Sequence, residues 1–150
     1  MPTPWKPARG KLGRLTPLLG AWRVEADTAR GPMVCTRRFH HTLGKKYVQL
    51  GAVWQFTDSS YEETALFGVG PTGDLEFWSF TSDGKQSQGR LADVTDLHPQ
   101  AVGFEADMPA GLARQAYFPD DEGGIRFIVE ARTKKGWSRM VDHLYLPDPE

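Results

Sequence analysis

Short runs of apolar and aromatic residues, many of them alternating with polar residues, follow one another along most of the chain, and turn-forming residues separate them. Glycine favours such turns because it adopts positive φ, and proline because its ring fixes φ. Aspartate favours them because its side chain hydrogen-bonds to the nearby backbone. Runs rich in aromatic and β-branched side chains are typical of strands. The pattern predicts about ten strands, over residues 20–27, 32–40, 46–56, 61–69, 74–81, 85–94, 101–108, 112–118, 124–132 and 137–147.

Only the leucine-rich segment 12–19 favours a helix, and Gly13 and Pro17 limit that helix to a turn or two. We find no internal repeat and no linker, which indicates one structural domain. We therefore expect a flexible basic N-terminal arm over residues 1–14 and a folded domain over residues 15–148. The arm is basic because it contains Lys6, Arg9, Lys11 and Arg14 and no acidic residue.

The strands follow one another too closely for crossover helices, so neighbouring strands should pair antiparallel. Several strands have a single apolar face; in 101–108, for example, Val102, Phe104, Ala106 and Met108 share one side. An open sheet of this size would leave two unpaired edges, and closure removes both. The predicted fold is therefore all-β: a single closed antiparallel up-and-down β-barrel of about ten strands with a short N-terminal helical plug.

A short leucine-rich turn runs into Gly20-Ala-Trp22, and a basic residue, Arg139, stands on the last strand. This combination resembles the opening and closing strands of lipocalin-like (calycin-type) barrels. In strand count the chain is similar to fatty-acid-binding proteins, nitrobindin-like haem proteins and uncharacterised bacterial lipocalin-like proteins. The resemblance implies that Arg139 packs over Trp22 as a structural end cap.

Charge and composition limit the kinds of partner that the chain is expected to bind. The formal net charge is −1, although residues 1–50 carry ten basic and two acidic residues, a local excess of +8. A chain without a global positive field is not expected to bind nucleic acid or a membrane surface. The chain shows no secretory signal and no apolar run long enough to span a membrane, and its single cysteine forms no disulfide framework. We expect a cytoplasmic protein whose partner is a small molecule; the sequence leaves the oligomeric state open.

Motifs for catalysis are weak. Residues 68–73 match G-x-G-x-x-G, but a predicted strand follows them instead of a helix, so we interpret them as a hairpin turn. Cys35 and His40 are five residues apart and point to opposite faces of a strand, which excludes a nucleophile–base pair there unless a bulge intervenes. Adjacent His40 and His41 also diverge, and no metal-ligand spacing is present. We therefore expect no metal site, no catalytic residue and, on balance, no enzyme.

One histidine remains a candidate ligand for a cofactor. His143 stands in the last strand, and in nitrobindin-like families the residue that binds the haem iron lies near the C-terminus. The resemblance therefore implies a possible haem protein with His143 as axial ligand. Otherwise the sequence predicts no cofactor.

Arginines stand on two strand faces that otherwise look inward. Arg37 shares a face with Met33, Cys35 and Phe39, and Arg114 shares one with Leu112, Ala116 and Phe118. An arginine remains charged when buried, so it needs acceptors. Those acceptors are either internal acids such as Glu63 or the anionic group of a ligand. A third interpretation is that the face assignment is off by one residue, or that the arginines pair with acids at the barrel mouth.

The leading hypothesis is binding of a small, largely apolar molecule with an anionic or acceptor group inside the barrel. The predicted anion contacts are Arg37 and Arg114, the polar contacts are His143 and Tyr145, and the apolar lining is Phe104, Met108 and Phe127. The alternatives are the haem protein, an uncharacterised enzyme, and a structural or interaction barrel without a ligand. Fatty-acid-binding proteins hold a carboxylate with Arg-x-Tyr on the last strand, whereas this chain has His143-x-Tyr145.

Overall fold

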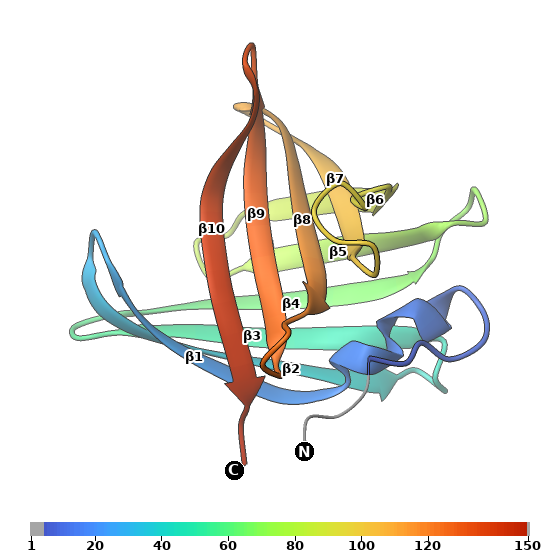
Figure 1. The fold of residues 1–150 in the computed structure, drawn as a ribbon, viewed down its shortest axis with the longest axis horizontal. Helices are drawn as coiled ribbons and strands as arrows, with labels where there is room; N and C mark the ends of the chain where they lie inside the picture. The colour runs from blue at the N-terminus through green and yellow to red at the C-terminus, as the bar shows by residue number, and fades with distance from the viewer. Residues whose placement is uncertain (1–4, 150) are drawn as a thin grey trace.

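The computed structural model describes residues 5–149 and consists of one barrel preceded by a short helix (Figure 1). A 3₁₀ helix, η1 (Leu12–Leu18), leads into ten antiparallel strands that close in the order β1-β10-β9-β8-β7-β6-β5-β4-β3-β2. The predicted fold class is confirmed. The strands are β1 (Gly20–Thr28), β2 (Gly31–Thr42), β3 (Tyr47–Phe56), β4 (Ser60–Val69), β5 (Leu75–Thr81), β6 (Gln86–Ala92), β7 (Val102–Met108), β8 (Gly111–Pro119), β9 (Ile125–Thr133) and β10 (Gly136–Pro147).

Chain neighbours pair along almost the whole barrel, and only the β1–β10 pair joins strands that are distant in sequence. That seam is short, since Trp22 lies opposite Pro147 and Arg23 opposite Leu146. Glycines with positive φ occupy several tight turns, among them Gly73 and Gly84, where a side chain would strain the backbone. No helix among the described residues is long and apolar enough to cross a membrane.

The helix η1 closes one end of the barrel. Its Leu15 and Leu18 are fully buried in the main core, and the Trp22 indole donates a hydrogen bond to the Leu18 carbonyl over 2.7 Å. The helix begins inside the segment predicted as an arm. Its N-terminal side is tied by the Ala8 amide, which donates to the Gly13 carbonyl, and by the Lys11 ammonium, which donates to the Gly73 carbonyl. Residues 1–4 of the predicted arm lie outside the described residues.

The predicted end cap of Trp22 and Arg139 is wrong. The Arg139 guanidinium forms ion pairs with Glu130 and Asp142, both at 3.1–3.2 Å. Trp22 instead lies opposite Pro147, eight residues further along β10. At about 3.3 Å per residue, eight residues separate the two positions by about 26 Å.

A bulge in β10 determines which wall of the barrel Arg139 faces. The register between β9 and β10 shifts between Arg139 and Val141, so Arg139 lies opposite Glu130 on the outer wall and Val141 lies opposite Val129 on the inner wall. One extra residue in a bulged strand reverses the facing of every residue before it. The sequence pattern contains no marker of this bulge.

Candidate functional site

The helix η1 lies at one end of the barrel, and we call the opposite end, which carries the β1–β2, β3–β4 and β9–β10 turns, the open end (Figure 1). On β1, β3, β9 and β10 the inner-face side chains nearer η1 are buried, whereas those nearer the open end are half-buried or more exposed. The half-buried apolar side chains that pack against the core at this end include Val24, Trp54, Val129 and Val141. The open end is therefore apolar over much of its inner wall.

A guanidinium lies at the centre of this interior. Arg37 on β2 is 1% exposed, and its Nη2 donates a hydrogen bond of 2.6 Å to the Tyr117 hydroxyl on β8. Its Cζ lies 4.3 Å from the ring centroid of Phe127. The rings of Trp54, Tyr117 and Tyr145 surround it at 5.6–5.8 Å. Aromatic rings stabilise a cation at such distances, but they do not replace hydrogen-bond acceptors in the guanidinium plane.

Two nitrogen atoms of this guanidinium have no acceptor. Nε and Nη1 of Arg37 are buried and make no hydrogen bond within residues 5–149. Buried donors are nearly always paired in folded proteins, and an unpaired charged donor is especially costly. Tyr117 adds a third donor, because its oxygen accepts from Arg37 while its hydroxyl hydrogen remains available. The cluster of Arg37 and Tyr117 therefore presents donors only.

The neighbouring groups do not neutralise Arg37. Burial raises the pKa of Tyr117 to about 12, and burial also raises the pKa of Tyr145, so both phenols are neutral at pH 7. Burial likewise raises the pKa of Cys35, against the opposing effect of the Arg37 charge, which keeps this residue a thiol. For Arg37 itself, burial acts to lower the pKa, but the surrounding polar groups outweigh burial and the pKa is raised. The guanidinium is therefore a permanent interior cation.

The internal acid Glu63 on β4 does not form an ion pair with Arg37 in the described part of the chain. Its Oε2 accepts a hydrogen bond of 2.5 Å from the Ser79 hydroxyl. Glu63 is close enough to contribute to the raised pKa of Arg37, but it leaves the two free nitrogens unbonded.

Arg114 does not point into the barrel, and that prediction is wrong. Its guanidinium donates to Glu130 at 2.7 and 2.9 Å and to Asp96 at 2.8 and 3.0 Å, and it lies 4.3 Å from the ring of Trp137. Tyr117, three residues further along β8, is the inward residue. Protein carboxylates already satisfy Arg114, which removes it as a ligand contact.

The outer face of β8 is apolar because a loop covers it. Ala116 packs in a second small cluster with Val94 and Ala101 from the β6–β7 connection, and Phe118 stacks on His98 at 5.0 Å. Gly103 permits this close packing, since a Cβ there would lie 2.6 Å from Val94. Two apolar faces on one strand make alternation uninformative, which is the reason Arg114 was assigned inward.

Four other residues that were predicted to contact a ligand lie on the inner faces of their strands. Phe104 and Phe127 are buried in the main core, and Tyr145 is buried beside Arg37. His143 lies opposite Phe127 in the β9–β10 register and is half-buried. Met108 is 40% exposed at the end of β7. The ligand and haem roles of these residues stay predictions.

Four neighbours of Arg37 were not predicted as site residues: Cys35, Trp54, Glu63 and Tyr117. Tyr117 faces away from Arg114 and towards Arg37. No local sequence signal links Arg37 and Tyr117, because β2 and β8 are not adjacent. Only closure of the barrel brings the two residues together. No group of three or more His, Cys, Asp or Glu within residues 5–149 could hold a metal ion.

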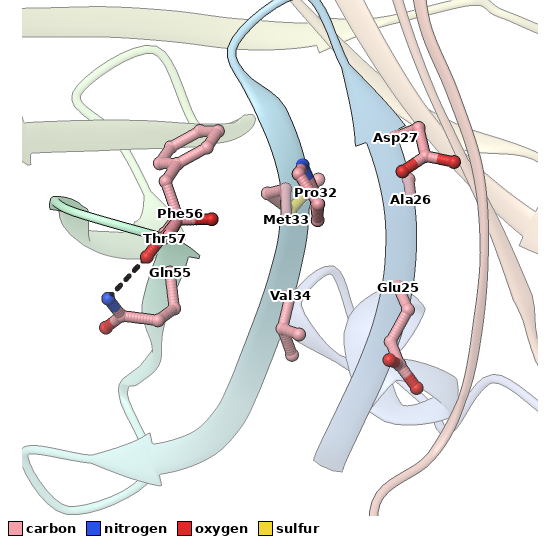
Figure 2. Close-up of a pocket in the computed structure, with 9 residues that line it drawn as sticks. All are labelled: Glu25, Ala26, Asp27, Pro32, Met33, Val34, Gln55, Phe56 and Thr57. Carbon is pink, nitrogen blue, oxygen red and sulfur yellow. Dashed lines mark hydrogen bonds between the residues drawn. The ribbon is translucent and has the colours of Figure 1, made fainter.

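A separate hollow of about 420 Å³ lies over β1, β2 and β3 (Figure 2). Its polar lining includes Glu25 and Asp27, whose exposed side chains face outward from β1, and Gln55, whose amide donates to the Phe56 carbonyl. A groove of about 1110 Å³ lies between η1 and the β8–β9 turn. Arg37 lines neither of these two hollows.

We expect His143 to make the protein less stable in mild acid. Burial is the main cause that lowers the pKa of His143, and the Arg37 charge adds to it against Asp142. The unfolded chain then binds a proton that the folded chain does not, so stability rises as pH increases towards about 6.5. Urea unfolding between about pH 5 and pH 7 should show a smaller pH dependence for His143→Gln than for wild type. The exposed control His41→Gln should keep the wild-type slope; equal slopes for all three proteins would contradict the expectation.

Comparison with known proteins identifies no family. No protein-family model matches the chain, and no curated protein matches it significantly. The closed ten-stranded antiparallel barrel is consistent with a calycin-like fold in general.

Proposed function

We propose that this barrel binds a small, largely apolar molecule whose head group accepts hydrogen bonds from Arg37 and Tyr117. The observation that carries the proposal is the pair of buried Arg37 nitrogens, Nε and Nη1, without acceptors. A ligand oxygen that meets them replaces an unsatisfied charged donor by a charge-assisted hydrogen bond. The apolar wall at the open end suits the rest of such a molecule.

We propose that the protein functions in a way similar to lipocalin-like carriers, and that it is located in the cytoplasm. His143 and Tyr145 are proposed as further polar contacts, and Phe104 and Phe127 as apolar contacts. We favour this function over a haem protein because the unsatisfied group in the interior is a hydrogen-bond donor, which calls for an acceptor rather than an iron ligand. A purified protein with a Soret band would support the haem alternative instead.

The test uses Arg37→Met and two amphiphiles, octanoate and octanamide, measured by isothermal titration calorimetry. We expect at least one amphiphile to bind the wild-type protein and Arg37→Met to weaken that binding about 10–150-fold, the equivalent of a charge-assisted hydrogen bond of roughly 1.5–3 kcal/mol. The empty variant should melt at the wild-type temperature or above it, because an apolar side chain replaces an unsatisfied buried cation.

The matched control is Arg23→Met, since Arg23 on neighbouring β1 is exposed and pairs with Glu25 at the surface. This control should bind like wild type. Binding that survives Arg37→Met unchanged would contradict the proposed site. Failure of both amphiphiles to bind would instead favour a side-chain-filled barrel in which water satisfies Arg37.

A further inference from the structure

We infer that the head group of the ligand carries no net charge and donates a hydrogen bond to Glu63 while it accepts hydrogen bonds from Arg37. This inference rests on the proposed function and narrows its ligand class. The expected chemistry is that of a primary amide or a related group with a donor and an acceptor side by side, rather than a carboxylate.

The register places the two charged residues on one row of the inner wall. Arg37 on β2 lies opposite Ala52 on β3, and Ala52 lies opposite Glu63 on β4. Two strand spacings separate the backbones of Arg37 and Glu63 by about 10 Å. Only the methyl group of Ala52 stands between them on that row, so both long side chains can reach one head group.

Glu63 keeps one oxygen available. Its Oε2 accepts the hydrogen bond from Ser79, a buried residue on β5 that fixes the carboxylate. The oxygen that Ser79 engages is Oε2, which leaves Oε1 for a second donor. Glu63 is half-buried, whereas Arg37 is buried, so the Glu63 side chain retains contact with solvent.

The charge balance of the interior decides the class of ligand. Arg37 carries one positive charge and Glu63 one negative charge, while Tyr117, Tyr145 and Cys35 are neutral. A carboxylate at Arg37 would add a second negative charge beside Glu63 in a poorly solvated space, where like charges repel strongly. A neutral head group that donates to Glu63 satisfies both residues without that repulsion. This is why we do not expect a fatty acid.

The experiment compares three ligands of equal chain length: octanamide, octanoate and N,N-dimethyloctanamide, which keeps the acceptor but has no N–H donor. Calorimetry on the wild-type protein should show octanamide binding about 10-fold or more tightly than either of the others. In Glu63→Gln the repulsion is gone, so the ratio of octanamide to octanoate affinity should shift towards octanoate by about 10-fold or more. The control Glu62→Gln changes the exposed neighbour on the outer face and should keep the wild-type ratio.

Each other result has a definite meaning. If octanoate binds the wild type as tightly as octanamide and its binding depends on Arg37, the inference is overturned and the proposed function stands. If octanamide is preferred but the ratio does not change in Glu63→Gln, Glu63 is not the acceptor and the inference also fails. If none of the three ligands binds, both the inference and the proposed function fail. The wild-type comparison alone decides the first point even where Glu63→Gln does not fold.

Discussion

Replacing Arg114 by methionine is expected to lower the free energy of unfolding by about 3–5 kcal/mol, the usual cost of breaking a buried ion pair from one side. Glu130, the main partner of Arg114, is only 5% exposed. The substitution would leave its carboxylate with Arg139 alone, whose side chain is 45% exposed. It would also release Asp96, through which the β6–β7 connection is held to β8. Urea titration of wild type and variant measures the effect.

The double variant Arg114→Met, Glu130→Met is the matched control for this prediction. Removing both charges leaves no stranded carboxylate, and an apolar pair in place of a buried ion pair is often neutral or stabilising. We therefore expect the double variant to recover most of the lost stability. Ligand affinity should not depend on Arg114 in any variant that folds. A single variant as stable as wild type would show that Glu130 finds sufficient solvation without Arg114.

The strands could be predicted from the sequence because each carries its own local signal. Turn residues mark the ends of β3, β5 and β9, and alternation marks the buried face of β7. The predicted ranges differ from the observed ones by no more than a few residues. Closure followed from the number of strands and the cost of open edges, which are general properties of sheets.

The arrangement of side chains in the interior could be predicted only in part. Arg37 shares its face with Met33, Cys35 and Phe39, and all four are buried, as alternation along β2 predicts. Arg114 failed the same reasoning because the β6–β7 connection makes the outer face of β8 apolar as well. Alternation of apolar and polar residues indicates which side chains of a strand are buried. It identifies the side chains inside the barrel only where no other segment covers the outer wall.

The partner of Arg37 lay beyond any local pattern. Tyr117 is 80 residues away along the chain and six strands away around the barrel in chain order. Their contact depends on the tilt and closure of the whole barrel, which a single sequence does not encode in short-range periodicity. The donor-only character of the cluster becomes visible once this contact is known.

Trp22→Ala is expected to cost about 3–5 kcal/mol of stability, the range for removing a large buried aromatic side chain. Trp22 is 9% exposed and joins the main core where β1 meets η1. Its indole also satisfies the Leu18 carbonyl at the end of the helix, so truncation would loosen the plug as well as empty the space beneath it. Trp22→Phe keeps most of the ring and loses only the hydrogen bond, so it should cost less, with about 1 kcal/mol for the hydrogen bond itself.

Arg139→Ala tests whether Arg139 and Trp22 interact. The partners of Arg139 are the carboxylates of β9 and β10, so its effect on stability should add to that of Trp22→Ala without coupling. Chemical unfolding of the three single variants and of the double variant Trp22→Ala, Arg139→Ala measures these effects. A coupling energy above about 0.5 kcal/mol between the two positions would indicate that Trp22 and Arg139 are in contact.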